Sequence, residues 1–151
     1  MSNLVLELRQ GEVMIVNGAP IRFRTRSRIE LTAKARFLFG KQIMAPDQAT
    51  TPARRIYFAL QAAYIGSETE REQGLESFRH FVTEFQQATT LDSVRQILDQ
   101  ALVAAEADDC YQALKLVRRI IQHEDTILGR DQNGTPRTGS STTHAEPEAR
   151  D

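Results

Sequence analysis

The sequence predicts an α+β fold in which a small antiparallel β-sheet at the N-terminus packs on a bundle of three or four helices. Within residues 3–32, three short segments alternate apolar and polar side chains with period two, as half-buried strands do, and residues 13–16 form a more fully apolar strand. From residue 51 to 128, apolar side chains instead recur at helical spacing. Residues 130–151 are rich in Gly, Ser, Thr, Pro and charge, which predicts a disordered tail. We therefore expect one domain at 1–129, with a β part at 1–45 and a helical part at 51–129.

Short strands are expected throughout the first part, at 3–9, 13–16, 21–25, 28–32 and 37–39. Leu4, Leu6 and Leu8 fall on one face of the first strand, and Ile21 is expected to point inward from the third. The pair Asn17-Gly18 is a strong signal for a tight hairpin turn. The last strand is ambiguous, because residues 35–44 could also form a short helix. So small a β unit needs its apolar face covered, and the helices are expected to cover it.

The first helix is expected to begin after Thr51 and end at Gly66. Thr51 is a favourable N-cap, and Pro52 suits the first helical position, where its missing N–H costs nothing. The helix is apolar on several sides and is therefore expected to be central, touching both the sheet and the other helices. Three of its aromatic side chains are candidate protein contacts: Tyr57, Phe58 and Tyr64.

Capping signals also mark the remaining helices. Ser67-Glu68-Thr69-Glu70 is a capping box for the second helix, and Thr90 is expected to cap the third. Asp108 or Asp109 is expected to begin a fourth helix that ends at Gly129. The alternative is that the third and fourth segments form one unbroken helix.

Targeting signals are missing from the sequence. The first nine residues lack a basic region followed by an apolar run, so no signal peptide is expected. No stretch approaches the roughly 18 apolar residues of a membrane span. A single cysteine, Cys110, cannot form an internal disulfide. These features predict a cytoplasmic protein that does not contact a membrane.

Catalytic motifs are missing as well. Neither a dinucleotide-binding nor a Walker-type glycine loop occurs, and the three histidines are far apart in sequence. His80 and His123 are expected to be surface or boundary residues of helices. Cys110 follows two aspartates, whose charge raises a thiol pKa and disfavours a reactive thiolate. We therefore expect that the protein is not an enzyme and that it binds no cofactor, no metal ion and no small-molecule substrate.

The net charge of −1 conceals two oppositely charged parts. Residues 1–55 carry ten Arg or Lys against four Asp or Glu, a balance of +6, and residues 56–151 carry nine against sixteen, a balance of −7. Segregated charge of this kind favours an anionic partner for the first part, and nucleic acid is one candidate. The alternative is that the two parts attract each other within the fold.

Arginines are concentrated at alternate positions of the expected third and fourth strands. If the chain turns at 25–27, these arginines share one face of a hairpin, where like charges repel. An anionic partner would remove that repulsion, and arginine matches phosphate bidentately and stacks on bases. Phe23 is expected to lie on the opposite face, in the core. The four arginines are Arg22, Arg24, Arg26 and Arg28.

Arg54 and Arg55 lie in the first turn of the first helix, where the helix dipole disfavours cations and free N–H groups bind anions. The alternative is a salt bridge to Asp47 or to an acidic residue of the helical part. The full set of candidate RNA-contacting cations is Arg22, Arg24, Arg26, Arg28, Lys34, Arg36, Arg54 and Arg55.

Several of these segments resemble the FlbT family of flagellum biosynthesis repressors. The resemblance covers residues 3–129, and its most specific part is the run Thr51-Pro52-Ala53-Arg54-Arg55. It is carried by Leu4–Arg9, Gly11-Glu12, Val16-Asn17-Gly18 and Thr51–Gln61. The family implies post-transcriptional control of flagellin synthesis through the 5′ untranslated region of flagellin mRNA, and a place in flagellum assembly. It implies no residue-level binding site.

The first strands also resemble, more weakly, the carbon storage regulator family of RNA-binding β proteins. The shared pattern is Leu4-x-Leu6, Arg9-x-Gly11-Glu12 and Ile15. This second resemblance points to the β part as the carrier of RNA contacts. The expected function is repression of flagellin translation through the mRNA leader. The alternative, from another class, is a protein-binding adaptor or chaperone-like module that acts on flagellin or another flagellar regulatory protein.

Overall fold

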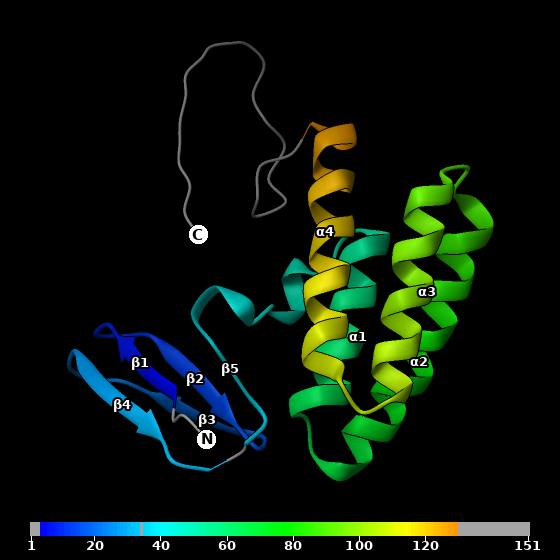
Figure 1. Ribbon diagram of the computed structural model, residues 1–151. Coiled ribbons are helices and arrows are strands. Elements are labelled where there is room, and N and C mark those ends of the chain that lie inside the picture. The colour runs from blue at the N-terminus through cyan, green and yellow to red at the C-terminus, as the bar shows by residue number, and fades with distance from the viewer. Residues whose placement is uncertain (1–3, 34, 130–151) are drawn as a thin grey trace.

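A computed structural model describes residues 4–33 and 35–129, and these residues have the predicted α+β architecture (Figure 1). The predicted tail at 130–151 lies outside the described residues, as do Lys34 and residue 3. The strands are β1 (Leu4–Leu8), β2 (Val13–Val16), β3 (Ala19–Arg22), β4 (Ser27–Leu31) and β5 (Phe37–Phe39). Two short 3₁₀ turns, Gly40–Gln42 and Pro46–Gln48, lead to α1 (Pro52–Ile65), α2 (Glu68–Ala88), α3 (Asp92–Glu106) and α4 (Cys110–Leu128).

The strands form two small antiparallel sheets rather than one. β2 lies between β3 and β5, and β1 pairs only with β4. The turn at Asn17-Gly18 is confirmed, since Val16 pairs with Ala19 across it. The predicted hairpin between the third and fourth strands is wrong, because β4 pairs with β1 instead. That pairing places Leu6 opposite Ile29, so apolar side chains of the two strands lie side by side.

The β3–β2–β5 sheet is a middle layer between β1–β4 and the helices. On one face of β2, Met14 is buried together with Leu8 of β1 in a small core outside the helical core. On the other face, Leu38 of β5 belongs to the helical core, and Ile15 packs against it. The helices therefore cover only the part of the middle sheet around Leu38 and Ile15, and β3 stays exposed.

Two apolar side chains expected inside the β part are exposed. Ile21 is 43% exposed and Leu4 is 45% exposed. β3 is an edge strand, and all four of its residues are exposed, Ile21 among them. Phe23 and Leu6 are partly buried, and only Leu8 of the three leucines of β1 is fully enclosed.

The predicted bounds of α1 are confirmed, and the Thr51 hydroxyl accepts a hydrogen bond from the Arg54 N–H at 3.2 Å. The capping box of α2 is confirmed as well. Thr90 is not the cap of α3: the N-cap is Leu91, which has no side-chain cap. Thr89, the C-cap of α2, accepts a hydrogen bond from the Leu91 N–H at 3.3 Å.

The third and fourth helical segments are separate helices. Asp109 caps α4 by accepting a hydrogen bond from the Gln112 N–H, and α4 ends at Gly129, which has a left-handed φ of 67°. Such a conformation favours glycine. Among the described residues, no helix is long and apolar enough to cross a membrane.

α1 is the central helix, as predicted. It packs against α2 and α4, and two of its tyrosines hold the β part. The Tyr57 hydroxyl donates to the Gln42 carbonyl oxygen at 2.5 Å, and the Tyr64 hydroxyl accepts from the Phe37 N–H at 3.3 Å. Gly74 brings α2 close to α1, because a Cβ at that position would lie 2.7 Å from the Ala59 carbonyl oxygen.

Candidate functional site

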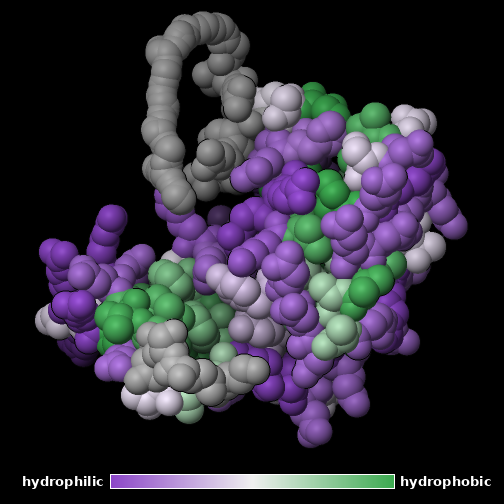
Figure 2. Space-filling view, in the orientation of Figure 1, coloured by the Kyte–Doolittle hydropathy of each residue, from purple (hydrophilic) through white to green (hydrophobic). Residues whose placement is uncertain are grey.

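Exposed arginines gather at the end of the β part that lies farthest from the helices (Figure 1). The β1–β2 turn and the β3–β4 connection meet there: the Gly11 N–H donates to the Phe23 carbonyl oxygen at 2.6 Å, and the Phe23 N–H donates to the Glu12 carbonyl oxygen at 2.9 Å. Figure 2 shows hydrophilic side chains at the outer edge of the β part, next to a hydrophobic patch on the same part. We call this arginine-rich end the arginine tip, and its members are Arg9, Arg22, Arg24, Arg26 and Arg28.

Carboxylates neutralise only part of the positive charge of the arginine tip. Arg26 forms an ion pair with Glu7 at 3.2 Å, with both side chains mostly exposed, and Arg28 lies opposite Glu7 in the β1–β4 register. An exposed pair of this kind contributes little stability. Within the described residues, no ion pair engages Arg22 or Arg24. The tip therefore presents cations that are held weakly or not at all.

The four arginines do not share one face of a hairpin, as the sequence had suggested. Arg22 and Arg28 belong to different sheets, and Arg24 and Arg26 lie in the connection between them. The four side chains are all exposed. Their proximity comes from the junction of the two sheets at the tip, and not from cross-strand pairing.

Arg54 and Arg55 differ sharply although they are neighbours. Arg54 is 2% exposed, and its two Nη atoms donate to the Asp125 carboxylate at 2.6 and 2.9 Å. Glu124 lies 3.8 Å from Arg54, so the salt-bridge alternative describes this arginine, with acids of α4 as partners. Arg55 is exposed. We therefore leave Arg54 out of the candidate RNA interface and keep Arg55.

Arg36 lies at the junction of the β part and the helices. Its backbone N–H donates to the Asn17 side-chain oxygen at 3.1 Å, and its carbonyl accepts from the Asn17 N–H at 2.8 Å. The side chain is partly buried, and its Nε has no hydrogen-bond partner among the described residues. Burial raises the pKa of Tyr64, an effect that the Phe37 N–H and the nearby Arg36 charge oppose. Lys34, the remaining candidate, is outside the described residues.

The three candidate protein contacts have different positions. Tyr57 is 2% exposed, its pKa is raised by burial, and the Arg118 guanidinium donates to its hydroxyl at 2.6 Å. Tyr64 is partly buried against Tyr111, with ring centroids 6.1 Å apart. Phe58 is partly buried and lines a hollow on the molecular surface. Tyr57 and Tyr64 therefore hold the fold together, and Phe58 remains a candidate contact.

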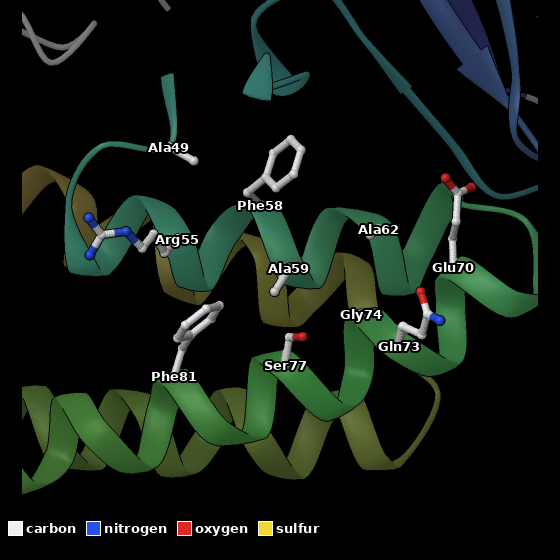
Figure 3. A pocket seen from close by; sticks show the side chains of 10 residues that line it. All are labelled: Ala49, Arg55, Phe58, Ala59, Ala62, Glu70, Gln73, Gly74, Ser77 and Phe81. Carbon is white, nitrogen blue, oxygen red and sulfur yellow. The ribbon is translucent and has the colours of Figure 1, made fainter. Parts of the chain in front are cut away.

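Phe58 is one of the residues that line a surface hollow along α1 and α2, and its ring projects from the side of α1 that faces away from α2 (Figure 3). This hollow and a second one that adjoins it, with volumes of about 330 and 430 Å³, share Arg55 and Phe81 and form a groove. We call it the α1–α2 groove. Figure 3 shows Phe81 rising from α2 toward α1, with Ala59 and Ser77 between the two helices. The groove is lined mainly by Ala and Phe side chains, with carboxylates at both ends.

The side chains with catalytic potential are placed as expected. Burial, followed by the charges of Asp108 and Asp109, raises the pKa of Cys110 to about 11. His80 and His123 are exposed. Residues 4–33 and 35–129 contain no group of three or more His, Cys, Asp or Glu placed to hold a metal ion.

Two elements of the site were missed by sequence reasoning. Arg9 joins the arginine tip, and the Arg9-x-Gly11-Glu12 pattern was the signal that could have found it. The α2 wall of the α1–α2 groove was also missed, because Phe81 and Ser77 follow an ordinary amphipathic pattern. An amphipathic pattern of this kind does not distinguish residues that line a surface groove from residues that face the core.

The fold and the site define a small α+β protein with a cationic β tip and an apolar groove on its helices. The family model described as "Flagellar protein FlbT" matches residues 4–128. A flagellum biosynthesis repressor protein FlbT from Caulobacter vibrioides is 35% identical over 139 residues, which are 91% of this chain and 98% of that protein. The chain belongs to the FlbT family of flagellar proteins, which confirms the resemblance.

Further relatives named FlbT cover nearly the whole chain. One from Agrobacterium fabrum is 32% identical over 137 residues, with 91% of each chain covered. One from Mesorhizobium japonicum is 31% identical over 141 residues, which are 90% of this chain and 93% of that protein. No solved structure matches the chain.

Proposed function

We propose that this protein represses flagellin synthesis by associating with the 5′ untranslated region of flagellin mRNA. The repressor role is supported by the names of its relatives, which are flagellum biosynthesis repressors. The observation that carries the RNA contact is the arginine tip, where five exposed guanidinium groups surround one end of the β part. Arg55 and Arg36 are further candidate contacts.

The chemistry of the tip suits a flexible polyanion. Guanidinium groups bind phosphate oxygens bidentately, and arginines that neutralise phosphates release condensed counterions, which favours binding. Single-stranded leaders also expose base faces on which guanidinium planes stack. A protein held on the leader would compete with the ribosome for that segment. Repression in this account needs binding and no catalysis.

The proposal is tested by recovering the native protein from cells with and without RNase and reading both RNA and protein. Flagellin leader RNA should be enriched with the wild-type protein and reduced with the Arg22→Gln/Arg24→Gln variant. A variant carrying Lys115→Gln and Arg119→Gln, which removes the same charge from α4, should retain the enrichment. Equal recovery of leader RNA with both variants would remove the arginine tip from the interface.

A second candidate function is a protein-binding adaptor that acts on flagellin or another flagellar regulatory protein. The observation that favours it is the α1–α2 groove, with the partly buried rings of Phe58 and Phe81 on its two helices. In the same experiment, a flagellar protein that is recovered equally after RNase treatment would support the adaptor. Complete loss of protein partners on RNase treatment would count against it.

A further inference from the structure

We propose that two copies of this protein join through the outer edges of their β4 strands, so that their two-stranded β1–β4 sheets become one four-stranded antiparallel sheet. The twofold axis passes between Ile29 of one copy and Ile29 of the other. This inference goes beyond the proposed function, because neither RNA contact at the arginine tip nor the α1–α2 groove requires it.

The outer edge of β4 is open to strand pairing. β4 pairs with β1 along all five of its residues, and within residues 4–33 and 35–129 no backbone hydrogen bond joins its other edge to a further strand. It lies at the end of the molecule farthest from α2 and α3 (Figure 1). An unpaired edge presents N–H and C=O groups that can pair with another strand. Two strands alone are only marginally stable, so further strands would stabilise this sheet.

The sequence of β4 is complementary to itself in the antiparallel direction. The strand reads Ser27-Arg28-Ile29-Glu30-Leu31, with a cation on one side of the central isoleucine and an anion on the other. When two copies pair with Ile29 opposite Ile29, Arg28 of each copy lies directly opposite Glu30 of the other. Opposite charges at such positions stabilise a strand pair, and like charges destabilise it. Twofold symmetry provides this contact twice.

Both charged side chains are accessible to a second copy. Arg28 and Glu30 are exposed, and the β1–β4 register places them on the same face as Val5 and Glu7. Within the described part of the chain, no ion pair engages Arg28. A carboxylate has about four acceptor positions, so Glu30 can accept a guanidinium group of the second copy in addition to its other contacts.

The apolar face of the β1–β4 sheet also gains from this pairing. Leu6 lies opposite Ile29 on that face, and both side chains are partly buried. In the four-stranded sheet, the Ile29 side chains of the two copies lie side by side between the two Leu6 side chains. The pairing therefore removes further apolar surface from water at the centre of the interface.

The edges of the other strands match a second copy less well. β3 contains Pro20, which has no N–H to donate to a partner strand. If β1 paired with itself about its central residue, Glu7 would lie opposite Val5 and would gain no opposite charge. In β5, the Phe37 N–H already donates to the Tyr64 hydroxyl of α1. β4 is therefore the strand to which a second copy is best matched.

The dimer would hold the two arginine tips apart. Antiparallel pairing places Ser27 of one copy, which adjoins its own tip, beside Leu31 of the other. The two groups of cations thus lie at opposite ends of the four-stranded sheet and repel each other little. Because Glu30 of the second copy would engage Arg28, the cations left for an anionic partner are chiefly Arg22 and Arg24.

The first test is sedimentation velocity of the full-length protein over a range of concentrations. The wild type should form a reversible dimer. Arg28→Glu and Glu30→Arg should each weaken it at least about tenfold, because each places like charges opposite one another twice. The double variant Arg28→Glu/Glu30→Arg, which exchanges the two charges, should recover the dimer. Arg119→Glu and Glu72→Arg make the same charge changes at exposed positions of α4 and α2 and should not alter it.

Mixing the two single variants tests the register directly. At a concentration where the wild type is dimeric, Arg28→Glu alone and Glu30→Arg alone should each be largely monomeric. An equimolar mixture of the two should form heterodimers, because the acidic edge of one variant then faces the basic edge of the other. A merely structural role of either residue does not predict this rescue. Circular dichroism checks that each variant is folded.

A second measurement does not depend on charge reversal. Ile29→Cys places one thiol opposite its copy across the axis, where Cα atoms about 4.5 to 5.5 Å apart suit a disulfide. Leu6→Cys is the matched control, since it lies on the same face, partly buried, but one strand farther from the axis. Under mild oxidation, Ile29→Cys should yield a covalent dimer and Leu6→Cys should not. The buried Cys110 is common to both variants.

Three results would overturn the proposal. One is a wild type that stays monomeric up to its highest soluble concentration. Another is a mixture of the Arg28→Glu and Glu30→Arg variants that is no more dimeric than either variant alone. The third is cross-linking of Leu6→Cys that equals or exceeds that of Ile29→Cys, which would place the contact between copies away from the β4 edge.

Discussion

Arginines in the two parts of the molecule have opposite environments. Arg54, at the start of α1, is buried and bound by the Asp125 carboxylate, with Glu124 beside it. The members of the arginine tip are all exposed, and the ion pair that engages Arg26 is mostly exposed as well. Arg54 thus serves packing in the helical part, whereas the arginine tip presents its charge on the β part.

The difference depends on where acidic partners lie in space. Asp125 is 71 positions from Arg54 in the sequence, yet α1 and α4 bring the two together. At the tip, Glu7 lies opposite Arg28 and also binds Arg26, so one carboxylate faces two cations. An arginine is therefore a good candidate for RNA contact only when the fold leaves it without a buried acid.

The largest expected effect is the loss of Arg54. Arg54→Ala leaves Asp125 buried without its partner, and breaking a buried pair in this way costs about 3 to 5 kcal/mol. Arg55→Ala, one position along the same helix, should change the free energy of unfolding by less than about 0.5 kcal/mol. Urea unfolding followed by circular dichroism measures both. Similar losses for the two variants would contradict the assignment of Arg54 to packing and Arg55 to the surface.

Two glycine substitutions, one in the helical part and one in the β part, allow a second comparison of the stability of the two parts. Gly74→Ala should destabilise by about 1 to 3 kcal/mol, because the added Cβ meets backbone atoms of α1 and overpacks the helix interface. Gly11→Ala, in a turn of the arginine tip, has open space around its Cβ but a φ of +86°, so we expect a loss nearer 1 kcal/mol. A stabilising Gly74→Ala, through helix propensity alone, would show that α1 and α2 are not closely packed.

Tyr64 tests how firmly the two parts are joined. Tyr64→Phe removes the hydroxyl that accepts from the Phe37 N–H, so we expect a loss of about 0.5 to 1.5 kcal/mol. Amide exchange of Phe37 should accelerate, while exchange in α3 should not change. If exchange accelerates equally throughout the chain, the tyrosine supports the whole fold and not the junction.

The smallest expected effect on stability is at the arginine tip. The Arg22→Gln/Arg24→Gln variant should unfold within about 0.5 kcal/mol of the wild type, since no ion pair among the described residues engages either side chain. Thermal unfolding of the two proteins side by side measures the difference. A loss of several kcal/mol would mean that these arginines support the β part, and would weaken their assignment to a partner.

Local signals in the sequence predicted most of the helical part. Thr51, Pro52 and Gly66 determine the ends of α1 through capping and backbone chemistry, which act within a few residues. The predicted cap of α3 was wrong by one residue, because the helix begins after Leu91 without a side-chain cap. A threonine before a helical segment therefore indicates where a helix begins only to within one or two residues.

Strand pairing and the site could not be predicted in the same way. The alternation in β1, β3 and β4 is similar, so it does not specify that β4 pairs with β1 and not with β3. The burial of Arg54 likewise depends on contacts across 71 positions. Charge segregation correctly placed cations in the β part, but only the fold separates the exposed arginines from the buried one.

The most direct test of the central claim is the salt dependence of binding to a flagellin leader RNA. For single-stranded RNA, log affinity falls with log salt at a slope of about −0.7 per neutralised phosphate. The Arg22→Gln/Arg24→Gln variant should therefore bind more weakly, with a slope flatter by about 1.4, while Lys115→Gln/Arg119→Gln should match the wild type. If both variants and the wild type share one affinity and one slope, or if the wild type does not bind at low salt, the arginine tip is not an RNA interface.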